Sequence, residues 1–353
     1  MRYTRRGTWE PIGLSALAVL LAVVACSPDS PNPASPLLSP ITARLECSGR
    51  GSDCTSSKNG RIAFSRGNDA TGSFVLFTTK ADGSDPRQLT AGGSTFDDNQ
   101  AEWSPDGSTL VFERDYWTGI SQQLFRVNAD GSGLTQLFDC SGKCLGVSDP
   151  IYSPDGKSIA FDEANGDDNY VSVGIWIMNA DGSNQRQATN RQAGATGEDH
   201  YASFSPDGRK LAFTRSYYNA QPVRQAIFVS NLDGSDLHRI TPWQLNAYGP
   251  DWSPDGKLIL FTSHYDVEPA GNEQLFTVHP DGSDLKQVVP SGLGQPSNES
   301  GRFSPDGKKI VFMHVNDPFP ASPIYTMNLD GSDVTMILSP AYQNQYPAWG
   351  THK

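Results

Sequence analysis

The sequence lacks the features that mark several large classes of protein. Its main apolar run, from Ile12 to Val24, is shorter than the roughly 20 residues that a transmembrane helix needs. No long stretch shows the apolar period of a helix. Basic residues are scarce, because 27 Lys and Arg stand against 39 Asp and Glu, for a net charge of −12. This acidity disfavours nucleic acid and anionic membrane surfaces, which attract Lys and Arg.

Common catalytic and metal-binding signatures are also missing. The sequence has no Gly-x-Ser-x-Gly, no His-Glu-x-x-His and no phosphate-binding glycine loop. Its Asp-Gly-Ser-Asp segments lack the alternating acidic ligands and the distal glutamate of a calcium loop. We therefore expect a protein without enzyme activity, cofactor or bound metal.

Cysteine is rare, with five residues in 353. Apart from Cys26, the four others are Cys47, Cys54, Cys140 and Cys144, an even number that suits two disulfides in an oxidising compartment. Three pairings are possible, and proximity in sequence favours 47–54 with 140–144. A metal site is the alternative, although no histidine lies near either pair.

The N-terminal segment has the pattern of an export signal. Arg2, Arg5 and Arg6 precede the apolar run, so residues 1–25 are predicted to be a signal peptide. A plain secretory signal is one interpretation. Residues 23–26, Val-Val-Ala-Cys, resemble the bacterial lipobox, which implies lipidation of Cys26 and, with Ser27 in place of Asp, an outer-membrane location. Residues 26–58 then form the lipidated start and a Pro- and Ser-rich tether.

What the sequence has in abundance is a repeat. An aromatic residue followed by Ser-Pro-Asp-Gly occurs five times, and a sixth aromatic, Trp349, precedes Gly350. The period is 46 to 52 residues, which indicates a repeat architecture. A second marker, Asp-Gly-Ser, keeps constant phase with the first. The leading aromatics are Trp103, Tyr152, Phe204, Trp252, Phe303 and Trp349.

Both markers have the chemistry of hairpin turns. In the second unit they separate four predicted strands, at 99–103, 109–112, 123–127 and 134–137, which make one antiparallel propeller blade. The first unit begins at its second strand, 61–64, and the chain ends after an unmatched first strand, 345–349. We predict an all-β, six-bladed propeller over residues 59–353 whose last strand completes the first blade. The compact residues two before each aromatic are expected to pack near the axis: Ala101, Pro150, Ala202, Pro250, Gly301 and Pro347.

These units resemble the bacterial PD40 (WD40-like) repeats of TolB-type propellers over residues 59–349. The resemblance implies a periplasmic protein of the envelope, because TolB belongs to the Tol-Pal system. The chain differs from that family in lacking its N-terminal α/β domain, which makes the TolA contact. The expectation is therefore a TolB-like propeller lipoprotein.

Candidate binding residues follow from the topology. Both marker turns lie on one face, and the variable loops on the other face are rich in acidic and aromatic residues. Residues just before each innermost strand should ring the mouth of the central channel. They are Asp98, Asn99, Asp149, Asp199, His200, Tyr248, Glu299 and Tyr346.

Two functions fit this composition. The first is a monomeric, non-enzymatic binding module on the periplasmic side of the outer membrane, with a protein or peptide partner on the loop face. The alternative is a carbohydrate-active or metal-assisted lyase or hydrolase that uses His200 and its acidic neighbours. A third interpretation is that these loops are simply solvated.

Overall fold

The computed structural model describes residues 59–351, without 69–71, 118–121, 141–143, 168–169, 190–196, 218–222, 265–272, 294–296 and 316–321. The chain divides into two compact units, Met1–Asp53 and Cys54–Lys353, and every described residue belongs to the second. The predicted signal peptide, the tether, Cys26, Cys47 and Cys54 lie outside the described residues.

Three sheets come from the ends of the chain and its first half. Blade 1 consists of β24 (Asn344–Thr351), β1 (Asn59–Asn68), β2 (Ser73–Thr79) and β3 (Arg87–Gln88). Blade 2 consists of β4 (Phe96–Trp103), β5 (Thr109–Tyr116), β6 (Gln123–Asn128) and β7 (Thr135–Phe138). Blade 3 consists of β8 (Gly146–Tyr152), β9 (Ser158–Asp167), β10 (Tyr170–Asn179) and β11 (Arg186–Gln187).

The second half supplies the other three. Blade 4 consists of β12 (Glu198–Phe204), β13 (Lys210–Tyr217), β14 (Arg224–Asn231) and β15 (His238–Arg239), followed by the 3-10 turn η1 (Trp243–Leu245). Blade 5 consists of β16 (Ala247–Trp252), β17 (Ile259–His264), β18 (Glu273–Val278) and β19 (Lys286–Val288). Blade 6 consists of β20 (Ser297–Phe303), β21 (Lys309–Val315), β22 (Ile324–Asn328) and β23 (Thr335–Leu338).

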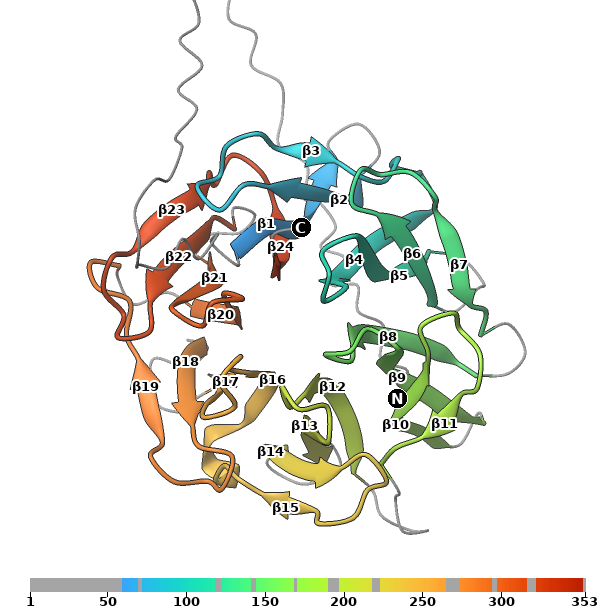
Figure 1. Ribbon diagram of the computed structural model, residues 1–353, viewed down its shortest axis with the longest axis vertical. Helices are drawn as coiled ribbons and strands as arrows, with labels where there is room; N and C mark the ends of the chain where they lie inside the picture. The colour runs from blue at the N-terminus through green and yellow to red at the C-terminus, as the bar shows by residue number, and fades with distance from the viewer. Residues whose placement is uncertain are drawn as a thin grey trace, which may run out of the picture. The chain divides into compact units, whose positions relative to one another are not determined.

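The six sheets of the described residues form a ring, with β24, β4, β8, β12, β16 and β20 innermost (Figure 1). The predicted six-bladed propeller is confirmed. Its closure is confirmed as well, because the C-terminal β24 pairs antiparallel with β1, placing Trp349 opposite Ile62. Within the described ranges, no helix is long and apolar enough to cross a membrane.

Each blade has the same aromatic core. The second strand of every blade contributes a phenylalanine that is at most 1% exposed. Directly opposite on the third strand stands another aromatic ring, as in the Phe64–Phe77 pair, whose centroids are 5.9 Å apart. The six leading aromatics and the compact residues two before them are also buried. The predicted packing role of those compact residues is therefore confirmed. The buried phenylalanines are Phe64, Phe112, Phe161, Phe213, Phe261 and Phe312.

The marker segments are turns, as predicted. In the first marker, the Ser104 hydroxyl donates to Asp106 Oδ1 at 2.7 Å, and the same oxygen accepts from the Ser108 N–H at 3.0 Å. In the second, Asp82 Oδ1 accepts from both the N–H and the hydroxyl of Ser84. These hydrogen bonds lower the pKa of the Asp82 carboxyl. The marker carboxylates are thus occupied by turn hydrogen bonds.

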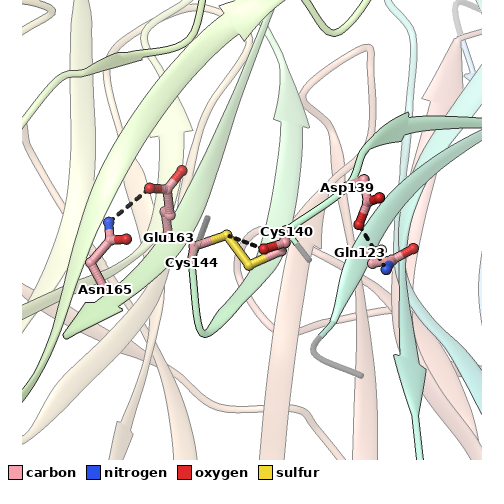
Figure 2. Close-up of a disulfide and its surroundings, with 6 residues drawn as sticks. All are labelled: Gln123, Asp139, Cys140, Cys144, Glu163 and Asn165. Atoms are coloured by element: carbon pink, nitrogen blue, oxygen red, sulfur yellow. Dashed lines mark hydrogen bonds between the residues drawn. A yellow bond between two sulfur atoms is a disulfide. The ribbon is translucent and has the colours of Figure 1, made fainter. Parts of the chain in front are cut away.

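A disulfide closes the connection between blades 2 and 3 (Figure 2). It joins Cys140 to Cys144, whose Cα atoms are 5.1 Å apart. Beside it, the Gln123 amide donates to Asp139 Oδ1 at 3.1 Å, linking this connection to β6. The predicted disulfide between Cys140 and Cys144 is confirmed.

Candidate functional site

A β-bulge in every innermost strand builds the axial surface. Pairing with the second strand shifts register between Asn99 and Glu102 in blade 2, and at the matching point of the other five blades. The bulged residue lies three positions before the leading aromatic and has a φ between 52° and 62° in all six blades. The six bulged residues are Gln100, Asp149, Tyr201, Gly249, Ser300 and Tyr346. Only one of them is glycine.

This bulge changes which side chains reach the axis. In a regular strand, consecutive residues point to opposite faces, whereas the extra residue of a bulge redirects its neighbour. In every blade the bulged residue and the residue before it are half-buried. The residue two positions before the bulged residue is buried. A left-handed conformation costs a non-glycine residue about 1 kcal/mol or more. Because strain of this kind gathers at functional sites, the bulge marks these paired positions as a candidate site.

The composition of the axial surface is uneven around the ring. Blades 1 and 2 contribute amide and hydroxyl groups: Gln345, Tyr346, Asn99 and Gln100. At these positions the carboxyl and imidazole groups all come from blades 3 to 6. We call the latter set, with the carboxylates that contact it, the acidic arc. It consists of Asp149, Asp162, Glu198, His200, Tyr201, Tyr248, Glu273 and Glu299.

One end of the arc is a carboxyl pair beside a histidine. Asp162 of β9 is 1% exposed, and its Oδ2 lies 3.3 Å from His200 Nδ1 and accepts from the Tyr201 N–H at 3.1 Å. His200 Nε2 lies 3.3 Å from Glu198 Oε2. Desolvation, and then the neighbouring Asp162 carboxylate, raise the pKa of Asp149 from 3.8 to about 8.

The other end is a second carboxyl pair. Desolvation, and then contact with Glu273, raise the pKa of Glu299 from 4.5 to about 9. The Tyr248 hydroxyl interacts with both carboxyl groups, and its own pKa is raised by burial. Glu273 Oε1 lies 3.7 Å from His264 Nδ1.

Aromatic rings connect the two pairs. The His200 and Tyr201 rings are 5.9 Å apart, and those of Tyr201 and Tyr248 are 6.2 Å apart between centroids. The arc is therefore continuous across blades 3 to 6. Within the described residues, its carboxylates form ion pairs only with His200 and His264, and none with Lys or Arg.

Two of the predicted site residues are structural instead. Asp98 and Asp199 are both 0% exposed and form two-pronged ion pairs with Arg114 and Arg215. The expectation that they ring the channel mouth is wrong, because they precede the bulge and are buried against an arginine of the adjacent strand. The remaining six lie on the axial surface: Asn99, Asp149, His200, Tyr248, Glu299 and Tyr346.

The sequence interpretation missed Tyr201 altogether and did not select Asp162 or Glu273 as site residues. The fixed phase of the repeat could have identified Tyr201, which lies three positions before Phe204 just as Asp149 lies before Tyr152. Asp162 and Glu273 belong to other strands, β9 and β18, and no pattern in the innermost strands indicates them. The described residues contain no group of three or more His, Cys, Asp or Glu side chains that could hold a metal ion.

The raised pKa values predict that alkali destabilises the fold. A carboxyl with a raised folded-state pKa contributes stability that is fully present below its unfolded pKa, and that is lost as the pH rises through the folded pKa. For Asp149 and Glu299 that window runs from about 4 up to about 8 and 9. We expect the free energy of unfolding to fall by roughly 5 kcal/mol or more between about pH 5 and pH 9.

Urea titrations at several pH values would measure this loss. The matched comparison is the double variant Asp149→Asn/Glu299→Gln, in which the slope should flatten because amides do not titrate. An unchanged slope in the variant would contradict the assignment of these two carboxyls.

Known proteins resemble this chain in sequence. Residues 173–349 match the family model described as the Tricorn protease N-terminal beta propeller domain. The uncharacterized peptidase YuxL of Bacillus subtilis (strain 168) is 29% identical over 185 residues, which are 51% of this chain and 24% of that protein. The uncharacterized protein Atu1656 of Agrobacterium fabrum is 28% identical over 145 residues, 40% of this chain and 43% of that protein. The matches thus span less than half the length of either relative.

Solved structures resemble it in fold. The crystal structure of TolB from Acinetobacter baumannii superimposes with a TM-score of 0.63 and 21% identity, covering 82% of this chain and 66% of that one. A putative TolB from Agrobacterium tumefaciens gives a TM-score of 0.59 and 19% identity, covering 83% and 99%. The fold is TolB-like.

Proposed function

Since this chain belongs to the family of the Tricorn protease N-terminal β-propeller domain, we propose that it is a binding module that holds a protein or peptide partner on its axial surface. The TolB-like fold and the export pattern of residues 1–26 support a place in the periplasm. We further propose that the mature protein is a monomer anchored to the outer membrane through Cys26, with no enzyme activity of its own.

The uncompensated acidic arc is the observation that carries this proposal. Many other carboxylates are already engaged, as in the marker turn of Asp82 or with arginine at Asp98. On the arc, carboxyl groups face one another beside half-buried aromatic rings. Carboxyl pairs that share a proton and have no Lys or Arg partner among the described residues favour an incoming partner that supplies a cation.

In-cell crosslinking followed by mass spectrometry tests the proposal. The variant is Asp149→Asn/Glu299→Gln, which changes the arc and keeps the shape of both side chains. The control is Asp236→Asn/Asp284→Asn, because these two carboxylates lie on exposed marker turns. We expect a specific partner that the wild type and the control capture and the arc variant loses. Equal capture by all three proteins would place the binding surface elsewhere.

A second candidate is the enzyme alternative, a lyase or hydrolase acting on envelope glycans. The observation in its favour is His200, whose two ring nitrogens each face a carboxylate oxygen at 3.3 Å. Such an arrangement can orient a general base. Turnover of cell-wall glycans by the purified protein that disappears in His200→Ala would support this activity and count against a pure binding role.

A further inference from the structure

We propose that the acidic arc binds a cationic group of the partner, a lysine ammonium or an arginine guanidinium, between Asp149 and Asp162. This inference rests on the proposed binding function and names the chemistry that its site selects. It is carried by a buried carboxylate oxygen that, within the described residues, has no N–H donor and faces another carboxyl group.

That oxygen is Asp162 Oδ1. The side chain is 1% exposed, and its Oδ2 is held by the Tyr201 N–H and by His200. Within the described residues, no N–H group donates to Oδ1, and the remaining neighbour of this carboxyl is another carboxyl, Asp149. A buried acceptor without a donor is costly. Two facing acceptors are satisfied by a shared proton or by a cation with several N–H groups.

The neighbours of this pair favour an organic cation. Tyr201, whose N–H donates to Asp162, has a half-buried ring 6.2 Å from that of Tyr248, and such rings stabilise ammonium and guanidinium groups. Across the axis, the amides of Asn99, Gln100 and Gln345 can accept and donate hydrogen bonds, as peptide backbone requires. A divalent metal finds no suitable cluster of three ligands in the described part of the chain.

Binding should release a proton. In the empty site, the pair retains a proton at neutral pH, since desolvation and the adjacent carboxylate raise the pKa of Asp149 to about 8. When the ammonium enters, the O–H bond breaks and its proton leaves to the buffer. Both carboxylates then accept N–H hydrogen bonds, and no other bond changes. The other titratable groups that face the pair are Glu198 and His200 from β12.

Isothermal titration calorimetry on the purified protein tests this inference. The probe is an unstructured glycine- and serine-based peptide carrying two lysines, and its matched twin has both lysine side chains acetylated. We expect the twin to bind at least about tenfold more weakly, the loss of a charge-assisted hydrogen bond. Binding of the lysine peptide should tighten as the pH rises from about 6 to about 8, because the pair then has less affinity for its proton.

Proton release is measured by repeating the titration in two buffers of different ionisation enthalpy. We expect release near neutral pH for the wild type and none for Asp149→Asn. Asparagine tolerates the left-handed backbone at this position, so the fold should be preserved. Equal binding of the acetylated twin, or binding without proton release, would overturn the inference. Crosslinking then separates the two proposals. If the arc variant still loses the crosslinked partner, the proposed binding function stands and only the cation-binding inference fails. If the arc variant keeps the partner, the binding function and the inference both fail.

Discussion

Gly83→Ala should lower the free energy of unfolding by about 3 to 5 kcal/mol, because it forces apart the two blades that close the ring. Gly83 lies in the marker turn of blade 1 with a φ of +81°, and an added Cβ would sit 2.0 Å from the backbone oxygen of Ile337 in blade 6. A backbone atom held in a β-sheet cannot move aside as a flexible side chain can. The second-marker glycine thus serves both the turn and the contact between blades.

Gly292→Ala is the matched control for this prediction. Gly292 has nearly the same φ, +80°, and an added Cβ would meet nothing within 4 Å. Its substitution should therefore cost only the backbone strain, about 1 kcal/mol. Urea denaturation of both variants measures the difference. Equal losses of stability would mean that the blade 1–blade 6 contact is looser than the structure shows.

Arg114→Met should cost about 3 to 5 kcal/mol, because it leaves the Asp98 carboxylate buried without its partner. Arg114 Nε and Nη2 donate to Asp98 Oδ1 and Oδ2 at 2.6 and 2.9 Å, and the guanidinium lies 4.0 Å from the Phe96 ring centroid. Burial raises the pKa of Asp98 even in the presence of Arg114. The loss should be smaller at acid pH, where the unpaired carboxyl can take up a proton.

Two further variants separate the buried charge from lost packing. Adding Asp98→Asn to Arg114→Met should recover part of the stability, because the amide carries no charge. Blade 6 already has an amide at the position of Asp98, since Asn298 Oδ1 lies 2.8 Å from His314 Nδ1. Arg87→Met, which removes an exposed ion pair with Asp85, should change stability by less than about 1 kcal/mol. If the double variant were no more stable than Arg114→Met, packing would explain the whole loss.

The fold could be predicted from the sequence because its signals are local. Ser-Pro-Asp-Gly and Asp-Gly-Ser form turns through hydrogen bonds that span only two to five residues, such as Ser108 N–H to Asp106 and Thr109 N–H to Ser104. Repetition in constant phase then defines the blades, and the unmatched strand 345–349 defines the closure. The departure at Gly350, where the other repeats have serine, has a cause distant in the chain: an added Cβ would lie 2.6 Å from the Trp103 ring.

The site was predictable only in part. Sequence position placed Asp149, His200, Tyr248 and Glu299 near the axis, as the structure does. The same criterion selected Asp98, which the structure buries against Arg114, a residue of the next strand. Position along the chain shows that a residue precedes an inner strand, but the side to which it points depends on the bulge and on its pairing with the neighbouring strand.

The sequence alone thus determined the repeat, the all-β class, the number of blades and the closure of the ring. The turn motifs define one blade, their number gives the number of blades, and the unmatched strands at the two ends of the repeat give the closure. The tertiary structure decided which acids face the axis, which are neutralised by arginine, and which meet in pairs. Asp162 and His200 belong to different blades and come within 3.3 Å only when the ring forms. Contacts between residues distant in the chain depend on packing, and packing is a property of the folded ring.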